Sequence, residues 1–222
     1  MKSFILNDVE VNLPEDWADI KFNKFLEFTK LIGAFDKRDE LDSSNEVAVW
    51  ERTLDDLQDS TKVLSFWCGM SENEISMIDL DLATEIMNQL SFINEAYEPI
   101  ALKDFTFEGE KYNLPQDLMA DSSFGRYVEA EQLELQSNLI DEGKIEILTR
   151  QVAILCKKEG EGEKLDDEVI NKRAEAFKNL DMATIWDVAF FFSKLEQKLM
   201  LNFLISQAVQ EIPKQELQQK EQ

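Results

Sequence analysis

The chain repeats one pattern about a hundred residues apart. The segment SFILNDVEVNLPED at residues 3–16 returns as DFTFEGEKYNLPQD at residues 104–117. The identical residues are separated by one constant offset of 101, as in the pairs Phe4 with Phe105 and Leu13 with Leu114. A fixed period of this length is typical of a duplicated module, and it constrains the fold more than any overall composition does.

Three further blocks follow this segment in the same order in both halves. The matching pairs are KFNKFLEF (21–28) with SFGRYVEA (123–130), TKVLSFWC (61–68) with TRQVAILC (149–156), and LDLAT (80–84) with LDMAT (180–184). Where one half is longer than the other, the extra residues are charged and include Gly or Ser, as expected of surface insertions. We therefore predict a tandem duplication of a module of about a hundred residues, which is a typical size for a small domain.

The two copies are expected at residues 1–98 and 101–210, with a flexible polar tail at 211–222. Each copy opens with a hairpin pattern, in which apolar residues alternate on both sides of a two-residue turn. The turn residues are Asn7-Asp8 in the first copy and Glu108-Gly109 in the second. The predicted fold class is mainly α with small β-hairpins (α+β), because the rest of each copy is helical in pattern.

Apolar residues three or four positions apart predict these helices. The expected helical stretches are 24–35, 46–68, 81–93, 166–180 and 181–209. In the second of them the apolar positions are Val47, Trp50, Leu54 and Leu57. Ser71 with Glu74 three residues later has the spacing of a capping box, and Asp181 is expected to cap the last helix.

Acidic residues outnumber basic ones by 46 to 23, which gives a net charge of −23. Such a chain repels nucleic-acid phosphates, stays soluble and favours basic partners. No uncharged apolar run approaches the roughly 18–20 residues that a membrane span needs, and the opening residues lack the pattern of a secretory signal. We expect a protein that binds neither nucleic acid nor membrane and stays in the cell that makes it.

The chain contains no histidine, so the usual general base and the commonest metal ligand are missing. Its two cysteines, Cys68 and Cys156, lie in apolar stretches and are expected to be free and buried. The glycines of EGEGEK at 159–164 are interpreted as a flexible insertion rather than a phosphate loop. We predict a non-enzymatic protein with no catalytic, metal-binding or cofactor-binding residues.

The predicted helix at 181–209 is apolar on most of its sides, which is typical of a helix that is fully buried or lies against a partner. Aromatic side chains are the usual anchors of a protein interface. The residues predicted to bind a partner are Ile185, Trp186, Phe190, Phe191, Leu195, Leu199, Phe203 and Leu204.

The segment VLSFWCGMSENEISMIDLDLATEIMNQLSFI (63–93) resembles the small tail assembly chaperones of tailed bacteriophages. Their pattern is an apolar helix that ends in a Gly-containing turn, an acidic pair, a Leu-x-x-x-Asp-Leu step and a last helix that ends in Phe. The residues that fill these places are Gly69, Glu72, Glu74, Ile78, Asp81, Leu82 and Phe92. The second half likewise resembles phage proteins of the tail and virion assembly region.

The resemblance implies a bacteriophage virion assembly protein, a tail assembly chaperone or adaptor that binds phage structural proteins through apolar helical surface in the host cytoplasm. Self-association is a further kind of contact for such a surface. Two alternatives stay open: a component packaged into the virion, at the head–tail junction or as internal cargo, and an acidic mimic of nucleic acid. The mimic needs carboxylates at phosphate-like spacing along one face, whereas the acids here are spread between apolar anchors.

Overall fold

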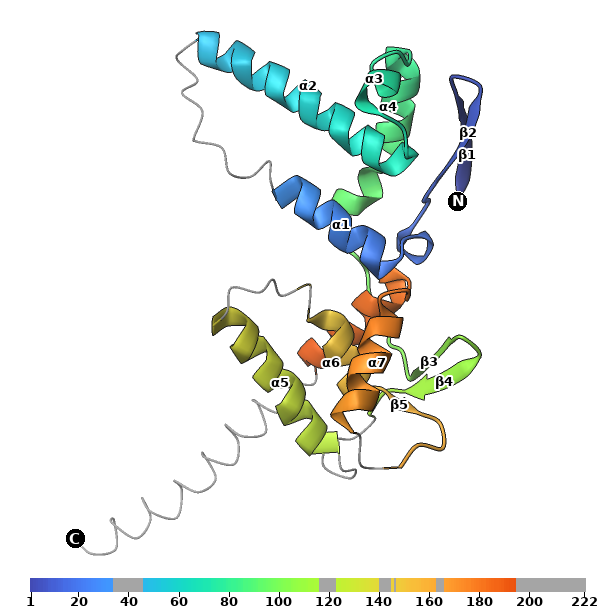
Figure 1. The fold of residues 1–222 in the computed structure, drawn as a ribbon, viewed down its shortest axis with the longest axis vertical. Coiled ribbons are helices and arrows are strands. Elements are labelled where there is room, and N and C mark those ends of the chain that lie inside the picture. Colours follow the sequence, from blue (N-terminus) through green and yellow to red (C-terminus); the bar gives the residue numbers. More distant parts are fainter. Residues whose placement is uncertain (34–45, 116–122, 140–144, 146, 163–165, 195–222) are drawn as a thin grey trace, which may run out of the picture.

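The computed structural model describes residues 1–33, 46–115, 123–139, 145, 147–162 and 166–194. This part of the chain is mostly helical and holds two small antiparallel sheets, one with two strands and one with three (Figure 1). The predicted fold class, mainly α with small β-hairpins, is confirmed.

The first half contains β1 (Lys2–Leu6), β2 (Val9–Leu13), η1 (Trp17–Asp19), α1 (Phe22–Gly33), α2 (Glu46–Cys68), α3 (Glu72–Ile75), α4 (Leu80–Gln89) and η2 (Ser91–Asn94). The second half contains β3 (Asp104–Phe107), β4 (Glu110–Asn113), α5 (Ser123–Leu139), α6 (Leu148–Leu155), β5 (Lys157–Lys158) and α7 (Asp167–Phe177). A further helix, here called the C-terminal helix, follows over residues 182–194. The predicted helix at 181–209 is thus described only as far as residue 194.

The two hairpins share one register and one turn geometry. Phe4 lies opposite Val11 in the first, and Phe105 lies opposite Tyr112 in the second, which are the positions related by the offset of 101. Both central turn residues have positive φ in each hairpin: 48° and 64° in the first, 50° and 78° in the second. Positive φ at both central residues is typical of a type I′ turn, whose backbone twist matches the right-handed twist of the two flanking strands. The hairpins therefore agree with the repeat, while the duplication of the whole module stays a prediction.

The halves differ after their third matching block. In each copy of this block a helix ends at or next to the cysteine. Helix α2 ends with Cys68, and α6 ends one residue before Cys156. After Cys68 the chain turns through Gly69, at a φ of 66°, into α3. After Cys156 it enters β5, which pairs with β4 and adds a third strand to the hairpin.

Arg173 holds the chain on both sides of this added strand, and it anchors Glu161 of the predicted insertion. Its buried guanidinium donates to the carbonyls of Ala153 and Cys156, at 3.2 and 3.1 Å, and pairs with the carboxylate of Glu161. These contacts close the C-terminal end of α6, where backbone carbonyls have no partner within the helix. Glu161 also accepts from the N–H of Lys158 at 3.0 Å.

The predicted capping box at α3 is confirmed. The N–H of Glu74 donates to Ser71 Oγ at 3.3 Å, and the Glu74 carboxylate accepts from the N–H of Ser71 at 2.8 Å. Asp79 is the N-cap residue of α4, without a capping hydrogen bond from its side chain. Lys24 of α1 donates to the carbonyl of Phe66 at 3.1 Å, which binds α1 to the end of α2.

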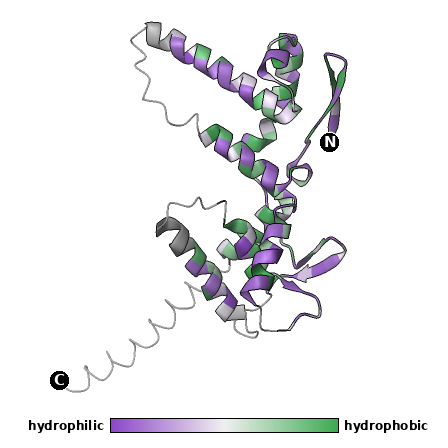
Figure 2. Cartoon of the chain, viewed as in Figure 1, coloured by the Kyte–Doolittle hydropathy of each residue, from purple (hydrophilic) through white to green (hydrophobic). Residues whose placement is uncertain are grey.

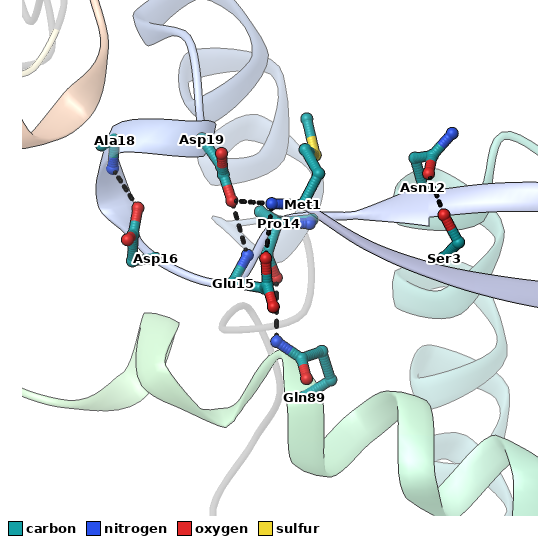
Figure 3. Close-up of polar contacts among 9 residues, drawn as sticks. All are labelled: Met1, Ser3, Asn12, Pro14, Glu15, Asp16, Ala18, Asp19 and Gln89. Carbon is teal, nitrogen blue, oxygen red and sulfur yellow. Dashed lines mark hydrogen bonds and ion pairs between the residues drawn. The ribbon is translucent and has the colours of Figure 1, made fainter.

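The N-terminal residues are held in a small polar cluster (Figure 3). The amino group of Met1 contacts the carboxylates of Glu15 and Asp19, at 2.6 and 2.7 Å. The hydrogen bond from that amino group, with one from the N–H of Glu15, lowers the pKa of Asp19. Gln89 of α4 donates to the carbonyl of Pro14 at 3.3 Å, so the end of the hairpin is joined to α4.

The two halves cap each other's helices where they meet. Phe22 and Asn23, at the start of α1, donate their N–H groups to the carbonyls of Leu180 and Lys178, both at 2.9 Å. In return Met182, at the start of the C-terminal helix, donates to the carbonyl of Ile20 at 2.8 Å. Each contact satisfies an N–H that a helix start leaves without a partner.

Apolar packing continues across this junction. The indole of Trp17 contacts the rings of Phe25 and Phe92 in its own half, at centroid distances of 5.3 and 5.7 Å. It also contacts Trp186 of the C-terminal helix at 6.0 Å. The buried residues of both halves form one continuous hydrophobic core.

Helix α2 extends beyond this core. It packs against α3, α4 and β2 only near its C-terminal end, and the rest of it projects from the body (Figure 1). Three residues of its predicted apolar stripe are exposed: Trp50 by 70%, Leu54 by 65% and Leu57 by 60%. The fourth, Val47, lies outside the residues whose side chains the structure describes. Apolar and polar residues alternate along this helix (Figure 2).

Candidate functional site

The C-terminal helix begins at the junction of the two halves. Asp181 caps it as predicted, because its carboxylate accepts from the N–H of Thr184 at 2.8 Å and from the Thr184 hydroxyl at 3.0 Å. The first turns of the helix lie against α1 and η1 through the aromatic cluster around Trp17. The helix therefore begins at the junction of the two halves, and its later described residues, such as Phe192, still pack against the core.

The residues predicted to bind a partner divide into three groups. Ile185 is fully buried and belongs to the core, and Trp186 is half-buried against Trp17 and Phe25. Phe190 is 38% exposed, and Phe191 is half-buried with its ring 5.7 Å from that of Phe192. The predicted residues outside the described part of the chain are Leu195, Leu199, Phe203 and Leu204.

Two hollows flank this helix and share Ala189 between them. The first, of about 240 Å³, is lined by Tyr97, Pro99, Trp186, Ala189 and Phe190. The second, of about 170 Å³, lies between α5, α6 and the C-terminal helix. Its lining residues are Tyr127, Ala130, Glu131, Leu148, Gln151, Val152, Leu155, Ala189, Phe192 and Ser193. An apolar cavity of about 150 Å³ is large enough for benzene, so each hollow can take one large apolar side chain.

Asp187 holds the wall of the first hollow in place. Its buried carboxylate accepts from the hydroxyl of Tyr97 at 2.9 Å and from the N–H of Ile100 at 2.7 Å. Burial, together with this hydrogen bond, raises the pKa of Tyr97 well above its usual range. The segment that joins the two halves is thereby fixed against the C-terminal helix.

Sequence reasoning missed Asp187 and recognised the apolar residues around it. The available signal is the position of one carboxylate on an otherwise apolar helix, WDVAFFF. A buried carboxylate is nearly always paired or hydrogen-bonded, so that position alone predicts a donor nearby. Its donors come from residues about ninety positions away, which no local pattern identifies.

Both cysteines are free and buried, as expected. Burial raises the pKa of the Cys68 thiol to about 11. Burial raises the pKa of Cys156 further, although the nearby guanidinium of Arg173 opposes this. A thiol that stays protonated is a poor nucleophile and a poor metal ligand.

Within the described ranges, the side chains of His, Cys, Asp and Glu form no group of three or more that could hold a metal ion. None of the described helices is both long enough and apolar enough to cross a membrane. No family model, curated protein or solved structure matches this chain.

Proposed function

We propose that this chain is a non-enzymatic virion assembly protein of a tailed bacteriophage, acting as a tail assembly chaperone or adaptor in the host cytoplasm. In this proposal the C-terminal helix binds an apolar segment of a phage structural protein. The observation that carries it is the pair of hollows beside one helix, with the exposed ring of Phe190 at the edge of the first.

The shape and lining of the hollows suit a protein ligand. Each has room for one large side chain, and the first is walled mainly by aromatic rings and a proline. A client segment that places one apolar side chain on each side of Ala189 would fill both hollows. Anchors of this kind supply most of the binding energy of a protein interface when they become fully buried.

The charge of the chain supports the same role. A net charge of −23 keeps a protein soluble while it exposes apolar surface, and it opposes association between copies. The resemblance of residues 63–93 to tail assembly chaperones supports the phage setting. The same acidity disfavours contact with nucleic acid.

The test is capture of clients from cells infected by the phage that carries this gene. The tagged chain is compared with Phe190→Asp and with Ile5→Asp, a control that adds the same charge at an apolar position of β1, where Ile5 is 73% exposed against 38% for Phe190. We expect the wild type and the Ile5 variant to retain a tail structural protein, identified by mass spectrometry, and the Phe190 variant to lose it at an unchanged melting temperature.

Two outcomes decide against the proposal. If the captured proteins include no phage structural protein, the phage assembly role is wrong. If Phe190→Asp captures the same client as the wild type, the C-terminal helix is not the binding surface. Mass spectrometry of purified virions separates the alternatives, since a packaged component is present in the finished particle and an assembly chaperone is absent from it.

A further inference from the structure

We propose that the outer edge of β2 is a second docking site, which binds an extended segment of another protein with a basic residue beside Glu10. The segment pairs with β2 as an added antiparallel strand. This edge belongs to a different element from the C-terminal helix and its hollows. The proposal goes beyond the function proposed above and does not depend on the phage assignment.

The second hairpin already carries a strand of this kind. Strand β5 pairs with the outer edge of β4, and the N–H of Glu159, just after β5, donates to the carbonyl of Lys111 at 2.8 Å. The offset of 101 places Lys111 on Glu10 of β2. The first hairpin has the same register, but among the described residues it has only two strands. The second half therefore shows the geometry in which β2 can take a third strand.

Two residues of β2 turn their backbone N–H and C=O groups away from β1. In an antiparallel pair, hydrogen-bonded positions alternate with positions whose backbone groups point outward. The pair that closes the two-residue turn, Leu6 with Val9, is hydrogen-bonded, so Glu10 and Asn12 are outward positions. These outward groups, here called the β2 edge, have no backbone partner among the described residues. An open edge of this kind is a template for pairing with another chain.

The two faces of the hairpin set the side-chain pattern of the occupant. Main-chain hydrogen bonds suit any extended segment, so its alternate side chains decide specificity. The residue opposite Val11 would lie on the face where Val11 and Phe4 are buried. The residue opposite Glu10 would lie on the other face, where the Ser3 hydroxyl donates to Asn12 Oδ1 at 2.6 Å (Figure 3). The occupant therefore alternates apolar residues with polar ones.

The charge on the β2 edge selects a basic residue among the polar ones. In residues 7–13, which form the turn and β2, the two charged side chains are the carboxylates of Asp8 and Glu10. Both are exposed, and neither forms an ion pair with a described residue. Side chains directly opposite each other have Cβ atoms about 4.5–5.5 Å apart, so Lys or Arg opposite Glu10 would be within reach of its carboxylate. In the second hairpin Lys158 of β5 pairs in this way with Glu110 of β4, at 2.9 Å.

The probe for this site is a short synthetic peptide that alternates Val and Lys. One matched peptide carries Glu in place of Lys. Another is N-methylated at its Lys residues, which removes the backbone donors that face β2 and keeps the charge. We expect the Lys peptide to bind the full-length chain at one saturable site, measured by fluorescence anisotropy, and both matched peptides to fail. Equal binding of the N-methylated peptide would mean that attraction to an acidic protein, and not strand pairing, holds the probe.

Two charge reversals locate the site on the chain. Glu10→Lys changes the β2 edge, and Glu51→Lys is its control at an exposed position of α2. Both change the net charge equally, and both should keep the melting temperature because each side chain is exposed. We expect Glu10→Lys to weaken binding of the Lys peptide at least tenfold and to gain binding of the Glu peptide, and Glu51→Lys to do neither. Equal effects of the two substitutions would overturn the proposal.

Amide hydrogen exchange, followed by NMR on the labelled full-length chain, completes the test. The amides of Glu10 and Asn12 should exchange rapidly in the free chain and become protected when the Lys peptide is bound. The inward amide of Val11 should be protected in both states. If the amides of Glu10 and Asn12 were protected without peptide, the chain itself or a second copy would already pair with this edge, and the proposal would fail.

Discussion

Asp187 accepts hydrogen bonds from Tyr97 and Ile100 with only 5% of its surface exposed. Asp187→Ala would leave both donors without an acceptor, at about 1–3 kcal/mol for each buried group left unsatisfied. We predict a loss of about 2–4 kcal/mol of unfolding free energy, measured by urea titration. Asp187→Asn retains an acceptor and should lose less. Asp79→Ala is the control, because Asp79 makes no capping hydrogen bond, and a loss as large as that of Asp187→Ala would contradict the assignment.

The two buried thiols make stability depend on alkaline pH. Each folded-state pKa lies above the unfolded value, so the unfolded chain releases these protons first as the pH rises. Their contribution is therefore fully present below pH 9 and is lost as the pH rises toward the folded value, about 11 for Cys68.

We predict that the free energy of unfolding falls as the pH rises from about 9 toward 11 under reducing conditions, a range in which tyrosine also ionises, at about pH 10. The double variant Cys68→Ala with Cys156→Ala should show a smaller fall over the same range. The comparison isolates the thiols, because every other titrating group is common to both proteins. An equal fall in the two proteins would assign the effect to other groups.

At the scale of elements, the two hairpin turns offer substitutions of opposite sign. Asp8 and Gly109 occupy the second central turn position, at φ values of 64° and 78°. Glycine adopts such φ values without strain, whereas alanine does not. We predict that Asp8→Gly stabilises the chain by several tenths of a kcal/mol and that Gly109→Ala destabilises it by about 1 kcal/mol.

Thermal melts of both variants check this prediction. An ideal Cβ on Gly109 meets no atom within 4 Å, so any loss comes from backbone strain and not from a clash. If both substitutions shifted the melting temperature in the same direction, the two turns would not be equivalent. The two hairpins would then share sequence and register, but their turns would not contribute to stability in the same way.

Local patterns predicted several of the elements, although α5 and α6 are not among the helical stretches that periodicity singled out. The turn pairs Asn7-Asp8 and Glu108-Gly109 lie where the alternation placed them, and the capping box of Ser71 is formed as its spacing indicated. These features depend on residues at most a few positions apart, so their physics is visible in a short stretch of sequence. The periodicity of 46–68 likewise predicted α2 with its correct bounds.

Long-range contacts could not be predicted in the same way. Periodicity shows which residues of α2 share a face, but not that α3 and α4 cover only one end of that face. Strand β5 is two residues long and forms because β4 offers an open edge and Arg173 holds the chain that follows. The hollows beside the C-terminal helix combine residues from separate parts of the chain: the first includes Tyr97 of the first half, and the second is lined by α5, α6 and the C-terminal helix.

For the whole molecule, the main question is whether the two predicted modules are independent. Each helix start at the junction takes its hydrogen-bond partner from the other half, as Phe22 does from Leu180 and Met182 from Ile20. Trp17 and Trp186 share one aromatic cluster across the same boundary. Separation of the halves would expose these rings and leave the helix starts to water.

We therefore predict that residues 1–98 and 99–222, expressed apart, each lack a cooperative thermal transition, while the full chain unfolds in a single one. Small domains of this length bury a limited fraction of their surface and tolerate little loss of core. Mixed in equal amounts, the two fragments should form a one-to-one complex by size-exclusion chromatography and regain the helical circular dichroism of the intact chain. Trp17→Ala in the first fragment should weaken that complex, whereas Ile5→Ala, at an exposed position of β1, should not. Two fragments that melt cooperatively alone and fail to associate would show instead that each module carries a sufficient core of its own.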